Sequence, residues 1–567
     1  MSKNRLTLSL TLTKCTFLSI NTMPIKTPLE MLYHWQDTTP NTVFLRQPVD
    51  GVVKEFTWHE TADQASRVAA GLIALDLPPA SNIAILSKNC AEWFIADLAI
   101  MLAGHVSVPI YSTAGEKTIR YVMGHAQCPV IFVGKLDKTT EQEAAISEGI
   151  IKLAFPYPNI VADQSWQQLL ENQPFMERPV PNMKSVMSIV YTSGSTGNPK
   201  GVVHNYESIC WAAHQALDEL GLKQQDRMLS YLPLAHITER VLVEMTSFYC
   251  GMRIDFIESL ETFARDIRNT QPTLFISVPR LWTRFQMGIL ATIPQNKLDF
   301  LLRIPILKNV IANKIRAKLG LQEARLCASG SAPIPQATLK WFHRLGVNIS
   351  EGWGMTENCA YGTCCVPFRA DKIGSIGHAY KGVDIRISDE GEILVKGNCN
   401  MKEYYLEPEK TADAYTEDGY LKTGDKGIMD ADGYIKISGR LKEIFKTSKG
   451  KYIAPVPIES KLMANSMIEQ VCVTGAKRKQ PIALVVLSAE AQQEALEKIE
   501  SSLLSTFDEV NATLESHAVL DHVVIMQDDW TVENGLLTPT LKIKRNVLED
   551  KYEELINKTY SGKIVHQ

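Results

Sequence analysis

The segment at residues 191–201, YTSGSTGNPKG, carries the densest set of groups that could hold an anion. Glycines let the backbone turn its N–H groups toward an anion, hydroxyls add donors, and Lys200 adds positive charge. A flexible Gly/Ser linker is the alternative, but linkers do not usually follow an apolar strand such as residues 188–190 or end in Pro-Lys-Gly. The segment is not a Walker loop, since Pro199 stands where that motif requires Gly. We predict a phosphate-binding loop formed by Thr192, Ser193, Gly194, Ser195, Thr196, Gly197 and Lys200.

Residues 351–357, EGWGMTE, combine an aromatic ring, a hydroxyl and a carboxylate. Trp353 offers a flat face for a nucleobase, and Thr356 can donate to a phosphate. Glu357 is a hard oxygen ligand of the kind that Mg²⁺ prefers, and Mg²⁺ would neutralise a polyphosphate. A helix cap is the ordinary interpretation of an isolated Thr-Glu pair. The small residues at 329–333, SGSAP, would let a flat ring approach the backbone.

Three further positions carry groups suited to a charged substrate. Asp425, in the turn Thr-Gly-Asp, could accept charge-assisted hydrogen bonds from two hydroxyls, or be an ordinary acidic turn residue. His236 could lie beside a carboxylate as a neutral or cationic group, or be a hydrogen-bonded structural histidine. Near the C-terminus, residues 538–545, TPTLKIKR, present two lysines, Lys542 and Lys544.

The elements that must position these groups alternate between strands and helices. This rhythm predicts right-handed crossovers and a largely parallel sheet. It returns after residue 188 and again from residue 276 to a helix near 335–345. The first elements are a strand at 83–87, a helix at 91–103, a strand at 106–110, a helix at 116–125 and a strand at 130–133.

The pattern changes near residue 390, where Gly- and Asp-rich turns separate short strands at 392–396 and 434–438. Residues 439–442 are predicted to be a hinge, and a new folding unit follows them, with strands at 471–474 and 482–487 and helices at 491–514 and 543–556. We expect an α/β fold with a large N-terminal domain of mixed α/β subdomains at 28–438 and a small α+β C-terminal domain at 443–567. Residues 1–27 are expected to be a disordered tail or to include a start codon upstream of the real one at Met23.

The composition excludes several classes of protein. The chain has 567 residues, too many for one ordinary core, and a net charge of −4, which argues against nucleic acid as a partner. The 11 cysteines are scattered without a CxxC pair, which indicates a reduced, cytoplasmic protein. No apolar run reaches the roughly 20 residues of a membrane span. Residues 91–103 are too short for one and carry Glu92 and Asp97. Weak peripheral association with a membrane stays open.

In their order along residues 28–560, these segments resemble the adenylate-forming superfamily of AMP-dependent synthetases and ligases. That superfamily includes acyl-CoA synthetases, luciferases and the adenylation domains of peptide synthetases. The PLxHxxER form at 233–240 and the segment 277–282 resemble its long-chain acyl-CoA synthetase branch. Leu541 stands where members commonly have Gly, again as in the long-chain branch.

The resemblance implies a role for each candidate residue. Segments 329–333 and 351–357 would enclose the adenine, Asp425 would hold the ribose, and Arg440 would reach ribose or phosphate. The K-x-x-R spacing assigns the catalytic role to Lys542 rather than Lys544. His236 would line the acyl pocket, and Glu357 would bind the metal. Lys442 would be the hinge of a mobile C-terminal domain, and Lys446 would face the site after that domain rotates. The nucleotide-facing set is Gly330, Ser331, Ala332, Glu351, Gly352, Trp353, Gly354, Thr356, Asp425 and Arg440.

The activity implied is an ATP-dependent acid–CoA ligase. It would activate a medium- or long-chain fatty acid as an acyl-adenylate, with Mg²⁺, and then transfer the acyl group to CoA. One alternative is an adenylate-forming ligase that loads a carrier protein. A non-catalytic lipid- or nucleotide-binding relative is disfavoured because Lys200, Glu357, Asp425, Arg440 and Lys542 are all present. Acid identity and oligomeric state stay open.

Overall fold

The computed structural model describes residues 24–192, 198–476, 478–538 and 541–567. Its largest sheet has the strand order β19-β9-β8-β4-β3-β5-β6-β7. Neighbours from β8 to β7 run parallel, as the alternating pattern predicts, whereas β9 and β19 extend the sheet in antiparallel fashion. The strands are β3 (Asn82–Leu86), β4 (Val106–Ile110), β5 (Val130–Val133), β6 (Ile151–Ala154), β7 (Gln164–Ser165), β8 (Val186–Thr192), β9 (Lys200–Asn205) and β19 (Glu403–Tyr404).

The helix α3 (Ala91–Leu102) is buried along its whole length, which explains its apolar sequence. Asp97 on this helix accepts from the Arg240 guanidinium at 2.9 Å, and Arg240 also donates to Glu244 at 3.1 Å. Burial raises the pKa of Glu244, and the nearby Asp97 carboxylate adds to that rise. Arg240 opens the π-helical turn η1 (Arg240–Met245), directly after α8 (Ile237–Glu239). Across the described ranges, no helix is long and apolar enough to cross a bilayer.

Two further sheets complete the core of the large domain. One has the order β10-β11-β1-β2, and the other has the order β12-β13-β14-β15-β16. Because β12, β13 and β14 are parallel, the segments that follow β13 and β14 leave the same edge of the sheet. These strands are β1 (Val43–Val49), β2 (Val52–Thr57), β10 (Arg227–Ser230), β11 (Arg253–Phe256), β12 (Leu274–Ser277), β13 (Leu326–Ser329), β14 (Ile349–Trp353), β15 (Thr363–Cys364) and β16 (His378–Ala379).

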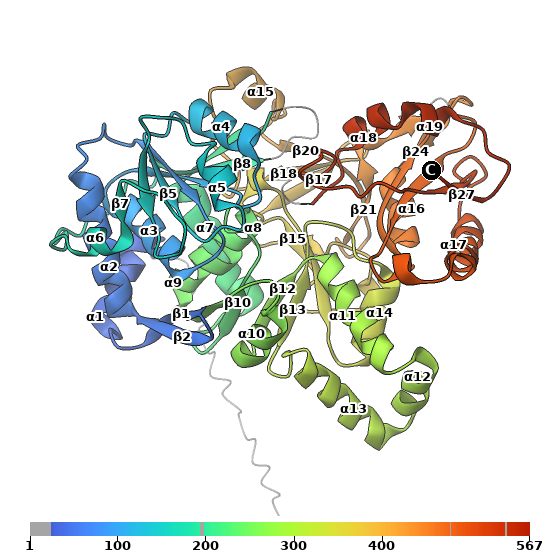
Figure 1. Cartoon of the computed structure of the whole chain (residues 1–567), viewed down its shortest axis with the longest axis horizontal. Coiled ribbons are helices and arrows are strands. Elements are labelled where there is room, and N and C mark those ends of the chain that lie inside the picture. The colour runs from blue at the N-terminus through green and yellow to red at the C-terminus, as the bar shows by residue number, and fades with distance from the viewer. Residues whose placement is uncertain (1–23, 193–197, 477, 539–540) are drawn as a thin grey trace, which may run out of the picture.

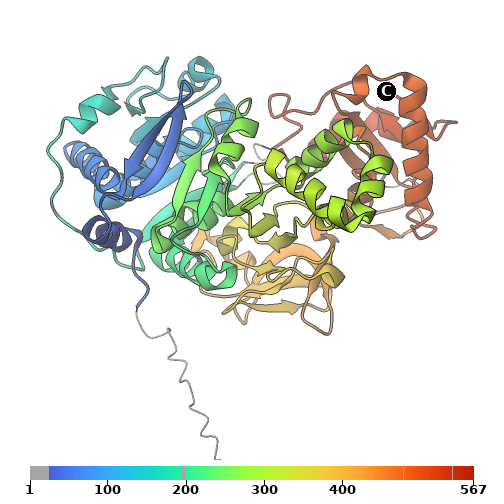
Figure 2. The same ribbon diagram turned by 90° about the horizontal axis from the view of Figure 1, so that it is seen from below.

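Helices surround these sheets, and two of them, α12 and α13, project away from the body of the molecule (Figures 1 and 2). Thr27 and Thr57 cap the first two helices with reciprocal Thr–Glu hydrogen bonds. The principal helices are α1 (Pro28–Thr38), α2 (Trp58–Ile73), α4 (Glu116–His125), α7 (Tyr206–Leu220), α9 (Thr246–Cys250), α10 (Phe263–Thr270), α11 (Pro279–Thr292), α12 (Gln295–Arg303), α13 (Pro305–Lys318), α14 (Gln336–Arg344) and α15 (Pro408–Asp413).

A small antiparallel sheet, β17-β18-β20-β21, leads to the C-terminal unit. Its last strand ends at Arg440, and the short helix η4 (Leu441–Glu443) follows. The predicted hinge at 439–442 therefore covers the end of this strand and the start of η4. The C-terminal unit then forms its own sheet, seen beside the large domain in Figure 1. The elements are β17 (Asp384–Ile387), β18 (Glu392–Lys396), β20 (Leu421–Met429), β21 (Ile435–Arg440), β22 (Phe445–Lys446), β23 (Tyr452–Ile453), β24 (Ile468–Thr474), β25 (Ile482–Leu487), β26 (Val523–Ile525), β27 (Ile564–His566), α16 (Pro455–Leu462) and α17 (Leu496–Asn511).

Two of the predicted C-terminal helices differ from the structure. The helix predicted at 543–556 is two helices, α18 (Arg545–Lys551) and α19 (Glu553–Asn557). Tyr552 separates them with φ −109° and ψ 23°, and its hydroxyl donates to Asp528 at 2.8 Å. A tertiary hydrogen bond thus overrides a continuous helical pattern. The helix predicted at 491–514 begins with a separate 3₁₀ turn, η5 (Ala491–Gln493), before α17.

Candidate active site

The predicted phosphate loop connects the antiparallel strands β8 and β9. Thr192 at the end of β8 lies opposite Lys200 at the start of β9, and its hydroxyl donates to the Lys200 carbonyl at 3.5 Å. Residues 193–197 lie outside the described residues, so the roles of Ser193, Gly194, Ser195, Thr196 and Gly197 stay predictions. The pairing of β8 with β9 fixes the two ends of the loop.

A tyrosine that the sequence did not single out joins Lys200 to Glu357. Because β19 pairs with β9, Tyr404 lies beside the start of β9. The Lys200 ammonium lies 3.8 Å from the centroid of the Tyr404 ring, and the Tyr404 hydroxyl donates to Glu357 Oε1 at 2.8 Å. Burial lowers the pKa of Lys200, and the Glu357 carboxylate partly offsets this. The cation–π contact and the hydrogen bond together fix the relative positions of a cation and a carboxylate.

A buried histidine ties the same strand to the segment that bears Glu357. His204 Nε2 on β9 lies 2.9 Å from the Thr356 carbonyl oxygen. Burial lowers the pKa of His204 to about 4, so the imidazole is neutral at pH 7 and Nε2–H donates to that carbonyl. Thr356 opens the 3₁₀ turn η2 (Thr356–Asn358), in which Glu357 is buried. No motif predicts this contact of His204, because its partner is 152 residues away in the chain.

The two segments predicted to enclose the adenine lie next to each other. Ser329 and Glu351 are register partners on β13 and β14. A Cβ on Gly330 would lie 3.2 Å from the Gly352 carbonyl oxygen, and one on Gly354 would lie 2.5 Å from the Ala360 backbone. Glycine at these two positions therefore permits the close backbone approach. Ser331 and Ala332, which follow β13, are exposed.

Glu351 is half-buried at this edge of the sheet. The Gly374 backbone N–H donates to its Oε2 at 3.1 Å. Burial raises the pKa of Glu351 to about 7. Its position beside the predicted adenine segments agrees with the sequence hypothesis, and its near-neutral pKa allows it to donate or accept a hydrogen bond there.

Asp425 is held from both sides before any ligand binds. The Trp353 indole N–H donates to Asp425 Oδ2 at 2.8 Å, and Arg440 Nε lies 2.9 Å from Oδ1. Asp425 and Arg440 are register partners on β20 and β21. Asp425 is 4% exposed, whereas the Arg440 side chain is 52% exposed. Trp353 thus has a positioning contact that the sequence did not predict.

Lys542 of the C-terminal unit is electrostatically coupled to this group of large-domain residues. Burial lowers the pKa of Lys542 and the Arg440 charge lowers it further, while the carboxylates of Asp425, Glu443 and Glu357 oppose the shift. These couplings require Lys542 to lie within electrostatic range of the large-domain residues. Its own side chain stays exposed, so the lysine is surrounded by protein yet still meets solvent.

The residue before the predicted catalytic lysine has an unusual backbone. Leu541 has φ 60°, in the left-handed region that glycine adopts most readily. The Lys542 backbone N–H donates to the Thr538 hydroxyl at 3.0 Å, which closes the turn. A left-handed backbone is one that glycine would adopt with less strain than leucine.

His236 is buried at the start of α8. Its Nδ1 accepts from the Thr238 backbone N–H at 3.2 Å, which caps α8. Burial lowers the pKa of His236 to about 4, and Lys542 adds to that shift. His236 is therefore neutral at pH 7, with its proton on Nε2. The neutral form predicted as one of two alternatives is the one that this environment favours.

Lys442 and Lys446 are both exposed, the first within η4 and the second three residues after it. Lys442 lies within η4 and is close enough to Lys200 to lower its pKa. The Lys446 ammonium lies 5.5 Å from the centroid of the Tyr452 ring. The predicted hinge residue thus lies between the phosphate-binding strand and the C-terminal unit.

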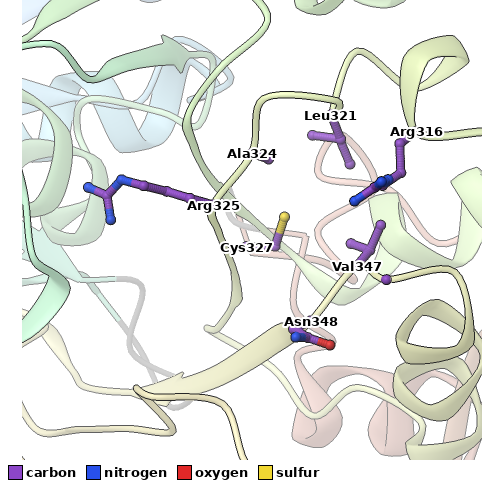
Figure 3. A pocket seen from close by; sticks show the side chains of 8 residues that line it. Arg316, Leu321, Ala324, Arg325, Cys327, Val347 and Asn348 are labelled. Atoms are coloured by element: carbon purple, nitrogen blue, oxygen red, sulfur yellow. The ribbon is translucent and has the colours of Figure 1, made fainter. Parts of the chain in front are cut away.

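A separate hollow beside β13 does not belong to this site. It has a volume of about 50 Å³, too small for a drug-sized ligand, and contains none of the predicted site residues. Figure 3 shows the Arg325 side chain extending away from the other labelled side chains, and Arg325 pairs with Asp226. The lining residues are Arg316, Leu321, Ala324, Arg325, Cys327, Gly346, Val347 and Asn348.

Comparisons with known proteins agree with this geometry. The family model described as AMP-binding enzyme matches residues 32–405, and the model of the AMP-binding enzyme C-terminal domain matches residues 442–563. The chain is 28% identical over 588 residues to the long-chain-fatty-acid–CoA ligase FadD15 of Mycobacterium bovis, covering 94% of this chain and 96% of that protein.

Solved structures share the fold. The anthranilate CoA ligase AuaEII in complex with anthranoyl-AMP superposes with a TM-score of 0.77 at 21% identity, covering 94% of this chain and 98% of that one. The adenylation domain of the carboxylic acid reductase from Segniliparus rugosus, in complex with AMP and a co-purified carboxylic acid, gives a TM-score of 0.78 at 20% identity, with 94% of each chain covered.

Proposed function

The chain belongs to the AMP-binding enzyme family, and from that premise we propose that it is an AMP-forming acid–CoA ligase that activates a fatty acid through an acyl-adenylate. One observation carries the proposal. Tyr404 holds the Lys200 ammonium and the Glu357 carboxylate together, and the pKa of Lys542 of the C-terminal unit responds to the charges of Arg440, Asp425 and Glu357. This is the arrangement that joining a carboxylate to ATP requires, because positive charge must be brought to two anions.

In the first half-reaction, an oxygen of the acid attacks the α-phosphorus of ATP and pyrophosphate leaves. The residues of this chain supply charge and position rather than a covalent intermediate. Lys200 would hold the phosphates, Asp425 the ribose hydroxyls, and Lys542 the charge that develops where acid and phosphate meet. The neutral His236 could donate Nε2–H to the acid without adding a charge.

Glu357 is suited to bind the Mg²⁺ of a Mg²⁺·ATP complex. Tyr404 occupies Oε1, so Oε2 is the oxygen that can turn to a metal. Mg²⁺ commonly takes one or two carboxylates together with phosphate and water, so a single carboxylate such as Glu357 is enough for this role. Bound Mg²⁺ would neutralise the triphosphate and stabilise the leaving pyrophosphate.

In the second half-reaction, the CoA thiol attacks the acyl carbonyl and AMP leaves. Lys542 is no longer needed, because the acid is already activated. We propose that the C-terminal domain, residues 443–567, rotates about Lys442 between the two halves, and that Lys446 faces the site in the second orientation. The exposed position of η4 between two separately folded units supports this assignment.

Replacing Glu357 with glutamine should raise the KM for Mg²⁺·ATP by about tenfold or more while changing the KM for the acid little. Loss of one charged ligand weakens metal binding, whereas the acid binds elsewhere. Pyrophosphate release measured over a matrix of Mg²⁺, ATP and acid concentrations tests this.

Tyr404→Phe is the matched control, since it keeps the carboxylate and removes only the hydroxyl that positions it. It should cause a smaller change in the same KM. If excess Mg²⁺ and ATP restore nothing to Glu357→Gln, and acid affinity changes instead, the metal assignment is wrong.

The preferred acid should be a medium- or long-chain fatty acid. The PLxHxxER segment at 233–240, the segment 277–282 and the similarity to FadD15 support this choice. Pyrophosphate release over a panel from acetate to C18 acids and aryl acids, with and without CoA, tests the whole proposal. Faster turnover of acetate or an aryl acid than of dodecanoate or palmitate would refute it.

Loading of a carrier protein is the second candidate for the acyl acceptor. It uses the same adenylation chemistry, so only the acceptor distinguishes it. Thioester formation with CoA and not with a phosphopantetheinylated carrier is the expected result. We also propose a cytoplasmic location, supported by the free cysteines throughout the described ranges.

A further inference from the structure

The projecting helices α12 and α13 carry a surface that the proposed reaction does not use. Phe300 on α12 is 64% exposed, and Ile306 and Val310 on α13 are 80% and 46% exposed. Residues 305–310 are all exposed in succession. Large apolar side chains gathered at one projecting end of a protein commonly mark a contact with another molecule or a membrane.

The opposite face of the same helices anchors them to the large domain. Leu298 is fully buried, and Ile315 and Leu319 are 5% and 8% exposed, within the core that includes Trp282 and Phe342. The two helices therefore have an inner apolar face that is already packed against the core of the large domain. The outer apolar side chains are additional to those needed for folding.

The charge of this region is opposite to that of the whole protein. Residues 295–318 contain six basic residues and one acidic residue, a net charge of +5 in a chain of net charge −4. The acidic residue, Asp299, pairs with Arg344 of α14. The basic residues are Lys297, Arg303, Lys308, Lys314, Arg316 and Lys318.

Basic and apolar side chains share one face of each helix. Lys297, Phe300 and Arg303 are spaced three residues apart on α12, and Val310 and Lys314 are four apart on α13, so each set lies on one side. Figure 1 shows the pair of helices projecting below the body of the molecule, and Figure 2, seen from below, shows the pair in front of the other elements. The side chains can therefore reach a flat surface that the rest of the protein does not touch.

From this placement we propose that α12 and α13 dock the protein on a membrane that contains anionic phospholipid. The apolar side chains would enter the boundary between headgroups and acyl chains, and the lysines and arginines would pair with lipid phosphates. A second copy of the chain fits less well, because a symmetric contact through this face would bring two basic surfaces together.

A partly apolar hollow on β17 and β20 offers a surface for comparison. It is lined by Ile385, Ile387, Ile428 and Met429, but its neighbours Arg386 and Asp418 pair with each other. Its apolar exposure is comparable, with Ile428 65% exposed, yet it lacks excess positive charge. It therefore provides a matched control surface.

The test is co-sedimentation of the full-length protein with vesicles. We expect binding to mixed phosphatidylcholine–phosphatidylglycerol vesicles, loss of that binding at high salt, and little binding to phosphatidylcholine alone. Lys297→Gln with Lys314→Gln, and separately Phe300→Ser with Val310→Ser, should each weaken binding by about tenfold or more. Ile428→Ser with Lys436→Gln, the control on neighbouring strands, should bind as the unmodified protein does.

All substituted side chains are exposed, so unchanged melting temperatures should accompany these results. Turnover of a water-soluble short acid should also be unchanged, which separates docking from the proposed catalytic function. Equal binding by the α12–α13 variants and the unmodified protein would overturn the proposal, as would weaker binding by the control alone. Concentration-dependent dimerisation that Phe300→Ser with Val310→Ser abolishes, without vesicle binding, would instead identify a contact between copies.

Discussion

Replacing Lys542 with alanine should lower the rate of acyl-adenylate formation by about 10²–10³-fold while leaving thioester formation from a supplied acyl-adenylate nearly unchanged. Lys542 is the C-terminal residue whose charge is felt by the large-domain site, through Arg440, Asp425 and Glu357. It would stabilise charge only where the acid meets ATP. Once the acyl-adenylate exists, that charge has already been neutralised by bond formation.

The two half-reactions should be measured separately, by ATP–pyrophosphate exchange and by conversion of synthetic acyl-adenylate with CoA. Lys544→Ala is the matched control, because Lys544 is two positions away and half-buried. It should retain most of both activities. Comparable losses in both half-reactions of Lys542→Ala would show that this lysine is not specific to the first half.

Replacing Lys442 with proline should preserve pyrophosphate exchange and abolish most acyl-CoA formation. A hinge must adopt two backbone conformations, and proline allows only φ near −65°. Lys442 lies in the 3₁₀ turn η4, where φ of −50 to −70° is usual and proline fits. The substitution should therefore retain the orientation described above, in which Lys542 faces the nucleotide residues.

Lys442→Ala separates the effect of the backbone from that of the side chain, because it removes the lysine charge and keeps the freedom of the backbone to change φ and ψ. It should support both half-reactions. If proline lowers the two half-reactions in proportion, with the melting temperature unchanged, Lys442 is an exposed surface lysine and not the hinge.

Local elements were well predicted from the sequence where local patterns determine them. The bounds of α4, β5, β18 and β25 equal the predicted ranges, because each is a short periodic run between turn residues. The split at Tyr552 was missed, since its cause is a hydrogen bond to Asp528, 24 residues earlier. The sheet of β10, β11, β1 and β2 is likewise not predictable from local pattern, because its strands come from distant parts of the chain.

The candidate site divides in a similar way. Lys200, Glu357, Asp425 and Lys542 can be proposed from the sequence because their side chains have chemistry that a motif makes visible. Tyr404 and His204 were not, because their importance arises from the pairing of β19 with β9 and from a backbone carbonyl, neither of which has a sequence signature. Arg240 shows the reverse: it ends a conspicuous motif but is fully buried in an ion network with Asp97 and Glu244.

The carboxylate of Asp425 accepts from two protein donors, and this affects how tightly a nucleotide can bind. Trp353 and Arg440 already restrict its rotation, so the conformational entropy of that side chain is lost when the protein folds rather than when ligand arrives. Each carboxylate oxygen retains a second lone pair for a hydroxyl. A preorganised acceptor of this kind favours a vicinal diol of fixed geometry and penalises a deoxyribose, which would leave one oriented, charged oxygen with its protein donor alone.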